Sequence, residues 1–332
     1  MRLRTVVLVL VSLLLAGEGV FSQSKFDQLE NQLQELSNSE RQAEAVALLD
    51  SVGSTFAENQ FDVSNWYGQL YFELQQFDKA FDVWETGHAK GYFYMLHPRM
   101  PMFKPVAEME RFKELSEVDM AMRAKANEIS RSISEIVLPD NYDSSRQYPL
   151  LIALHGGGRE LEQVKQHWQS ERLSTEFIVM YVQSYRHYNL KRFGWSSGDQ
   201  RAQDDIRRLF DDVVARYSVD TSRVIIGGIS AGGVMAIDIA LAGIIPLVGF
   251  YGVCPAQPRS FDAELVNGIK ARGLKGYIIA GDTDFYHDSQ VTMTALFDEI
   301  GFPYEYHIIE GLGHDYPDDF SEWIDRGLEF LD

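Results

Sequence analysis

The stretch Val224-Ile225-Ile226-Gly227-Gly228-Ile229-Ser230-Ala231-Gly232-Gly233 decides the fold of this chain. An apolar run typical of a buried strand leads into Gly228-x-Ser230-x-Gly232 and then into small residues typical of a helix. Such a strand-to-helix turn holds a serine in a strained conformation with its hydroxyl exposed, and the glycines leave room for close neighbours. The pattern predicts that Ser230 is a nucleophile and that the amide of Ala231, at the helix N-terminus, binds an oxyanion.

Candidates for the other two members of a catalytic triad follow later in the chain, each after an apolar strand. The first strand ends in Gly281-Asp282-Thr283-Asp284, and the second ends in Gly311-Leu312-Gly313-His314-Asp315. The order serine, acid, histidine is the one that a nucleophile elbow requires. We therefore expect His314 to be the general base and Asp284 to orient it, with Asp282 as the alternative acid.

A glycine-rich loop precedes the elbow. The apolar run 150–154 leads into His155-Gly156-Gly157-Gly158. A loop of this kind can lend a backbone N–H to the same oxyanion, and we expect this donor to be Gly157, with Gly156 beside the substrate. His155 is expected to brace the loop rather than to take part in the chemistry.

The loop 183–199 follows the strand before the elbow, so it should border the active site. It is rich in aromatic and basic residues in an otherwise acidic chain. Tyr185 and Trp195 are predicted to contact the substrate, and so is His287, which follows the acid turn. Flat apolar rings and nearby cations favour an aromatic or carbohydrate-linked ester over a long lipid.

The motifs LHGGG, GISAGG, GDTD and GLGH together resemble those of the α/β-hydrolase superfamily, over about Arg131 to Asp332. Within it the chain is most similar to bacterial carboxylesterases of the phospholipase/carboxylesterase and polyhydroxybutyrate-depolymerase-like branches. The resemblance implies a doubly wound, mostly parallel sheet and a Ser-His-Asp triad that needs no cofactor. Asp284 fits the acid position G-x-x-D of that superfamily.

Alternation of apolar strands with amphipathic helices leads to the same fold class. The pattern predicts strands near 131–138, 148–154, 176–183, 223–229, 246–252, 275–281 and 304–310. It predicts helices near 160–173, 200–217, 231–243, 258–272, 286–300 and 318–331. All four motifs then lie at the carboxyl ends of strands, where ligands bind in such sheets.

Composition excludes several other classes of protein. The formal net charge of −19 argues against nucleic acid as a partner. A single cysteine, Cys254, excludes an internal disulfide, and without a CxxC or HExxH pattern the sequence predicts no metal site.

Residues 1–22 are predicted to be a signal peptide. Arg2 and Arg4 precede the apolar run 6–16, and small residues follow near Ser22. The run is too short for a comfortable membrane span, so we expect a periplasmic or secreted protein, with an uncleaved anchor as the alternative.

Residues 23–127 are predicted to form an all-α region before the catalytic domain, 128–332. The pair Asn65–Leu74 and Phe77–His88 resembles a tetratricopeptide repeat, and further helices are expected at Lys25–Leu36, Glu40–Val52 and Val118–Ser130. Because a free-standing array needs about three repeats, a structural role is favoured over a protein-partner or dimer contact.

These expectations favour an exported serine esterase that acts on a small-molecule or carbohydrate-linked ester. A peptidase of the prolyl-oligopeptidase type is the enzymatic alternative, because it shares the fold and the triad. A binding protein with a vestigial triad is the non-enzymatic alternative, although no triad position is replaced.

Overall fold

The computed structural model describes residues 24–332, so the predicted signal peptide lies outside the described residues. The chain divides into two compact units. Of the described residues, one unit holds 24–92 together with Pro98–Leu115, and the other holds Phe93–His97 together with Ser116–Asp332. No helix of the described part is long and apolar enough to cross a membrane.

The first unit is helical. A reciprocal pair of hydrogen bonds between Ser24 and Asp27 caps the first helix. Trp84 packs so closely on Gly68 that a Cβ atom there would lie 2.2 Å from its indole nitrogen, which joins two helices tightly. The likeness to a tetratricopeptide repeat stays a prediction. The helices are α1 (Lys25–Asn38), α2 (Gln42–Val52), α3 (Gln60–Glu73), α4 (Phe77–Ala89) and the start of α5 (Glu110–Ile129), with short 3-10 turns at Gly53–Thr55, Ala57–Asn59 and Pro101–Phe103.

The second unit is built on one seven-stranded sheet in the order β1-β3-β2-β4-β5-β6-β7. The first strand pairs antiparallel with β3, and all other pairs are parallel. The predicted α/β class with a mostly parallel sheet is confirmed. The strands are β1 (Ile133–Val137), β2 (Tyr148–Leu154), β3 (Ile178–Gln183), β4 (Val219–Ile229), β5 (Gly249–Val253), β6 (Lys275–Gly281) and β7 (Tyr304–Ile309).

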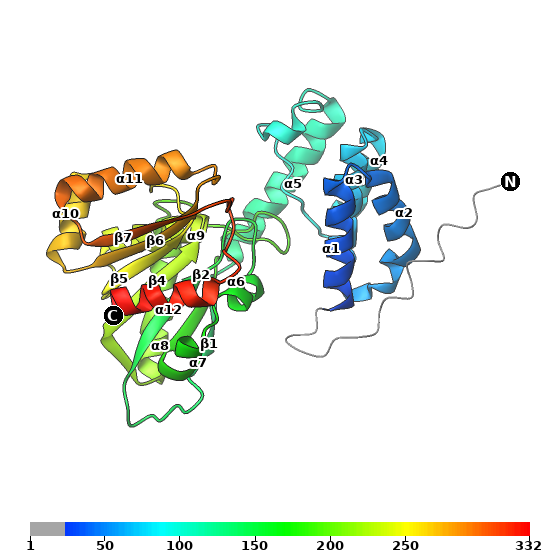
Figure 1. Ribbon diagram of the computed structural model, residues 1–332. Helices are drawn as coiled ribbons and strands as arrows, with labels where there is room; N and C mark the ends of the chain where they lie inside the picture. Colours follow the sequence, from blue (N-terminus) through cyan, green and yellow to red (C-terminus); the bar gives the residue numbers. More distant parts are fainter. Residues whose placement is uncertain (1–23) are drawn as a thin grey trace. The chain divides into compact units, whose positions relative to one another are not determined.

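Helices cover both faces of this sheet (Figure 1). Alternate residues of β2 belong to different cores: Leu150 and Ile152 join one apolar cluster, and Leu151 joins the other. The first cluster lies under α8 (Gln200–Arg216), α9 (Ala231–Ala242), α10 (Ala263–Ala271) and α11 (His287–Ile300), and the second under α6 (Leu161–His167), α7 (Glu171–Glu176) and α12 (Phe320–Leu331).

The predicted helix 160–173 is wrong in its extent, and so is the predicted start of a helix at Val118, since α5 begins at Glu110. The range 160–173 was expected to be continuous, but the structure breaks it into α6 and α7. The break lies at the fully buried Trp168, whose carbonyl accepts a hydrogen bond from the Tyr181 hydroxyl at 2.7 Å. Ser170 then begins α7 by accepting the Leu173 N–H.

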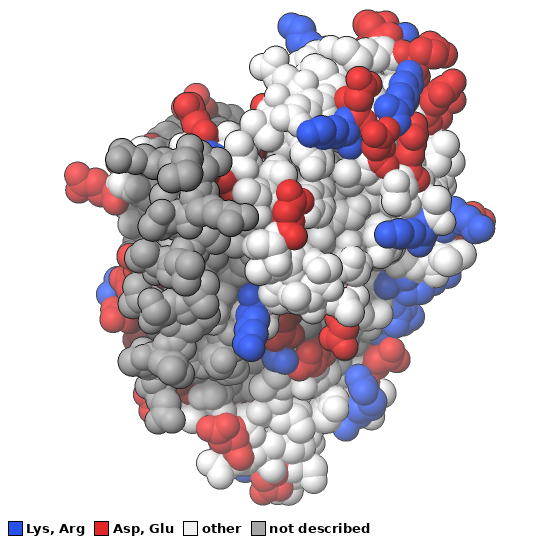
Figure 2. Space-filling model, turned by 90° about the vertical axis from the view of Figure 1, so that its right-hand side faces the viewer, with Lys and Arg blue, Asp and Glu red and all other residues white. Residues whose placement is uncertain are grey.

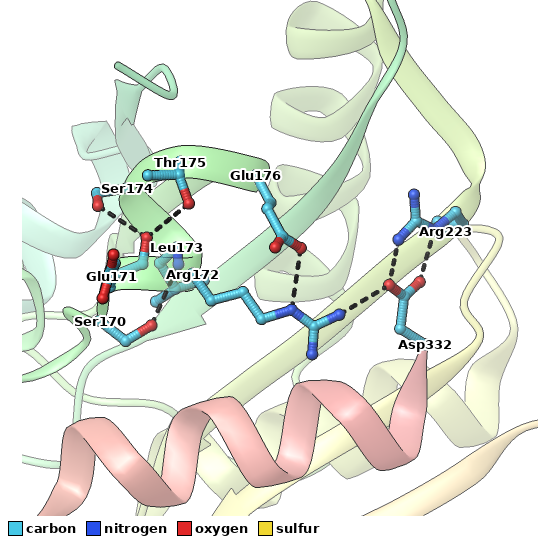
Figure 3. A network of polar contacts seen from close by, with 9 residues as sticks. All are labelled: Ser170, Glu171, Arg172, Leu173, Ser174, Thr175, Glu176, Arg223 and Asp332. Carbon is cyan, nitrogen blue, oxygen red and sulfur yellow. Dashed lines mark hydrogen bonds and ion pairs between the residues drawn. The ribbon is translucent and has the colours of Figure 1, made fainter. Parts of the chain in front are cut away.

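An ion-pair network ties the end of α12 to the rest of the unit (Figure 3). The carboxylate of Asp332 accepts hydrogen bonds from Arg223 of β4 and from Arg172 of α7, and Arg172 also pairs with Glu176.

Charged side chains of both signs are intermixed on the face shown in Figure 2. Basic side chains lie there among acidic ones rather than in a basic patch.

Candidate active site

Ser230 occupies the turn between β4 and α9 in a strained conformation. Its φ of 55° and ψ of −121° lie outside the regions that side chains favour, and its N–H donates to the Val253 carbonyl at 2.8 Å. A Cβ atom on Gly228 would lie 2.6 Å from the backbone of Gly232, and one on Gly232 would lie 2.4 Å from the carbonyl oxygen of His155. Both glycines are therefore required by close approach of the backbone, as a nucleophile elbow demands.

His314 is paired with a buried carboxylate. Its Nδ1 lies 2.8 Å from Oδ1 of Asp284, which is 4% exposed. That carboxylate also accepts the N–H of Tyr286 at 2.9 Å and the amide of Gln290 at 2.7 Å. Burial alone would raise the pKa of Asp284, but these hydrogen bonds and His314 outweigh it, and the pKa is lowered. Asp284 is thus held as an anion that fixes the orientation of the imidazole.

Asp282, the alternative acid, has different partners. It is exposed, and its Oδ1 accepts the N–H of Gly311 at 2.8 Å across the turn that follows β7. It braces the loop that carries His314 and leaves the hydrogen bond to the imidazole to Asp284.

The glycine-rich loop lies against the start of α9. A Cβ atom on Gly157 would be 3.6 Å from that of Ala231, so the two predicted oxyanion donors are neighbours. Below them His155 is buried: its Nε2 accepts the Ser184 N–H at 3.1 Å, so the proton lies on Nδ1 and is donated to the Gly156 carbonyl at 2.6 Å. Burial lowers the pKa of His155 to about 4, which keeps the ring neutral.

A pocket of about 310 Å³ opens over this arrangement. It brings together Ser230 and His314 with Gly156 and Gly157, which are four of the residues predicted from sequence. Its full lining is His155, Gly156, Gly157, Arg159, Gln163, Val164, His167, Ile229, Ser230, His314, Asp315 and Tyr316.

Three predicted substrate contacts are absent from the lining of that pocket. Tyr185 is buried, with its hydroxyl donating to Asp199 at 2.8 Å. Trp195 is 4% exposed and donates its indole N–H to the carbonyl of His155 at 2.9 Å. Trp195 therefore supports the glycine-rich loop, while Tyr185 is held by Asp199. His287 is the first residue of α11 and lies outside the lining as well.

Sequence reasoning missed an aromatic pair beside His314. Phe285 is 71% exposed and its ring lies 4.1 Å from the His314 ring, while the Tyr286 ring lies 5.4 Å from it. The signal available was their place directly after the acid turn. Arg159, which also lines the pocket, was missed too. Its available signal was its place directly after the glycine-rich loop.

One trio of potential metal ligands occurs among the described residues. Single ligand atoms of Cys254, Asp284 and His314 lie within 4.8 Å of one another. Burial raises the pKa of the Cys254 thiol to about 12, so it stays protonated and is a poor metal ligand, and both other groups are engaged with each other. The trio does not fit a resident metal.

Comparisons with known proteins give distant matches. No protein-family model matches the chain. Over 121 residues the chain is 28% identical to a bifunctional acetylxylan esterase/xylanase of Neocallimastix patriciarum. The matched segment makes up 35% of this chain and only 17% of that protein. The chain resembles the structure of an uncharacterized protein from Bacillus cereus, with a TM-score of 0.51, 22% identity and coverage of 93% of this chain and 99% of that one. A substrate-bound serine hydrolase of Staphylococcus aureus, FphF, matches with a TM-score of 0.48, 16% identity and coverage of 61% and 98%.

The match to the Bacillus cereus structure and the geometry agree on the fold. A mostly parallel seven-stranded sheet is covered on both faces, and a strained serine follows its central strand. The histidine and its carboxylate follow β7 and β6, in the order that the fold uses. The chain has the α/β-hydrolase fold, and Ser230 and His314 both line its pocket.

Proposed function

We propose that the chain is an exported serine esterase with the triad Ser230, His314 and Asp284. The observation that carries the proposal is a single pocket lined by a serine in a strained turn and by a histidine that a buried carboxylate holds. A structural serine has no need of the positive φ, which costs about 1–3 kcal/mol and is retained where function requires it.

The proposed reaction has two steps, acylation of Ser230 and hydrolysis of the acyl-enzyme. The Ser230 hydroxyl attacks the ester carbonyl carbon while His314 takes its proton, and the amides of Gly157 and Ala231 bind the resulting oxyanion. Collapse of this intermediate expels the alcohol, which takes the proton from His314 and leaves an acyl-enzyme. Water then attacks the acyl group, gives its proton to His314, and releases the acid as Ser230 recovers its proton. No step requires a cofactor.

A short acyl group on a carbohydrate or aromatic alcohol is the substrate class that we propose. The pocket of about 310 Å³ suits a small group, and the exposed ring of Phe285 beside His314 offers a flat face to a sugar or an arene. The acetylxylan esterase among the relatives supports the same class.

Export and the role of the helical unit belong to this proposal as well. The charge and apolar pattern of residues 1–22 supports a periplasmic or secreted location. For the helical unit we favour a structural role over a protein-partner or dimer contact, since its repeat-like pair is a single one.

Hydrolysis of p-nitrophenyl acetate, butyrate and decanoate by the mature protein tests the activity. We expect the two short esters to be preferred and all turnover to vanish in Ser230→Ala, while Ser222→Ala, an exposed serine of the same strand, keeps it. Preference for an aminoacyl p-nitroanilide would favour the peptidase instead. No turnover, together with no labelling of Ser230 by a fluorophosphonate, would contradict the proposal.

A further inference from the structure

Arg159 is rooted rigidly at the edge of the candidate active site. It directly follows the glycine-rich loop, and its backbone forms an antiparallel bridge with Phe193. Its N–H donates to the Phe193 carbonyl at 3.2 Å, and its carbonyl accepts the Phe193 N–H at 2.9 Å. The side chain lines the same pocket as Ser230 and His314. A fixed root of this kind keeps a long side chain close to the reacting ester.

The guanidinium of Arg159 is uncommitted. Across residues 24–332 it makes no hydrogen bond or ion pair, although it is exposed in the pocket. Two nearby arginines are occupied: Arg186 lies 3.7 Å from the Asp199 carboxylate, and Arg192 pairs with Glu160 at 2.5 Å. Among the described residues that line this pocket, Arg159 is the one arginine or lysine.

Gln163 and Tyr316, whose side chains carry hydrogen-bond donors, line the pocket together with Arg159. The amide oxygen of Gln163 accepts the Glu160 N–H, which leaves its NH₂ group available. The Tyr316 hydroxyl accepts the indole N–H of Trp168 at 3.2 Å, which leaves its own proton to donate. His167 stacks on the Tyr316 ring at 4.2 Å and joins the same lining.

One acidic residue, Asp315, lines the pocket together with these donors. Its carboxylate accepts the N–H of Tyr316 at 2.8 Å and forms no ion pair with Arg159 within the described chain. A free arginine with neighbouring neutral donors matches the geometry of a carboxylate, which arginine binds through two parallel hydrogen bonds.

We propose that Arg159, with Gln163 and Tyr316, forms a subsite that binds a carboxylate carried by the ester substrate. The inference deepens the proposed function and rests on it. Because the pocket is small, the carboxylate lies a few atoms from the scissile ester bond. The subsite also offsets the repulsion that an anionic substrate meets from a strongly acidic protein.

Matched pairs of esters test the subsite. Mono-p-nitrophenyl glutarate against p-nitrophenyl pentanoate places the charge on the acyl side, and 4-acetoxybenzoate against phenyl acetate places it on the alcohol side. For one pair we expect wild type to favour the anionic member and Arg159→Gln to lower that preference about tenfold to a hundredfold. The loss should fall on KM, and Arg159→Lys should recover part of it because the charge remains.

Two controls sharpen the result. Arg326→Gln removes an exposed arginine of α12 and should leave both ratios unchanged. Asp315→Asn removes the acidic charge of the pocket and should raise the ratio that Arg159→Gln lowers. The preference should also weaken with added salt.

The outcome separates this inference from the proposed function. If neutral esters are hydrolysed but Arg159→Gln changes neither ratio, the subsite is wrong and the esterase stands. If no ester in either pair is hydrolysed, the proposed function has failed and the subsite fails with it.

Discussion

Asp282 and Asp284 are both aspartates and lie two residues apart, yet only Asp284 forms a hydrogen bond with His314. We expect Asp284→Asn to lower kcat about 10⁴-fold, because an amide in place of the carboxylate stabilises the wrong imidazole tautomer. Asp282→Asn, the matched control, should retain kcat within a few-fold. Steady-state kinetics on p-nitrophenyl acetate measure both, and the reverse ranking would transfer the role to Asp282.

Buried His155 makes folding stability depend on pH. Its pKa is lowered to about 4 in the folded state, so below pH 6.5 the unfolded chain binds a proton that the folded chain does not. Stability is therefore unaffected above pH 6.5 and falls on acidification, by about 3 kcal/mol from this group by pH 4. Urea unfolding at pH 7, 6 and 5 measures the slope. His155→Asn should show a shallower slope, and an equal slope in both proteins would refute the assignment.

Local motifs were enough to predict that Ser230 and His314 meet in one pocket, whereas the contacts around them could not be predicted. Ser230 and His314 stand in short patterns whose chemistry dictates their spacing. The inward direction of Tyr185 and Trp195 depends on Asp199 and on the carbonyl of His155, which no local pattern reveals. Aromatic residues in a loop near a site are thus ambiguous until tertiary partners are known.

Among the structural elements, the break between α6 and α7 shows why boundaries escape sequence analysis. Helical spacing continues through Trp168, but its indole donates to Tyr316 and its carbonyl accepts from Tyr181, both distant in sequence. Tertiary hydrogen bonds replace the next turn of helix. Ser170 was a local cap signal that a stricter interpretation could have used.

We expect the substitution of alanine for glycine to have opposite effects on the free energy of unfolding at two positions in different elements. A Cβ atom on Gly228 at the end of β4 would lie 2.6 Å from backbone, so Gly228→Ala should cost about 2–3 kcal/mol and displace Ser230. Gly268 lies exposed within α10 with nothing within 4 Å, so Gly268→Ala should stabilise by about 0.5–1 kcal/mol. Urea unfolding and esterase assays measure both. Gly228→Ala with wild-type stability and activity would contradict the close approach.

For the whole molecule, alternation of strands and helices along the chain was enough to predict the sheet and its covering layers. The division of the chain into two compact units was harder to predict from the sequence. Phe93–His97 belongs with the sheet because the N–H groups of Tyr94 and Leu96 donate to buried Asp119 at 2.6 and 2.9 Å. A buried aspartate that serves backbone amides far away in sequence carries no periodic signal.

Asp332, at the end of α12, joins three elements of the second unit. Its carboxylate accepts hydrogen bonds from Arg172 of α7 and Arg223 of β4. Its side chain is 9% exposed, so Asp332→Asn should destabilise the protein by about 1–3 kcal/mol by leaving two arginines without their shared anion. Glu322→Gln, which breaks an exposed pair with Arg326, should cost less than about 0.5 kcal/mol. Urea unfolding compares the variants, and kcat on p-nitrophenyl acetate should stay unchanged because Asp332 does not line the pocket. Equal stability of the two variants would mean that the network is screened by water despite its burial.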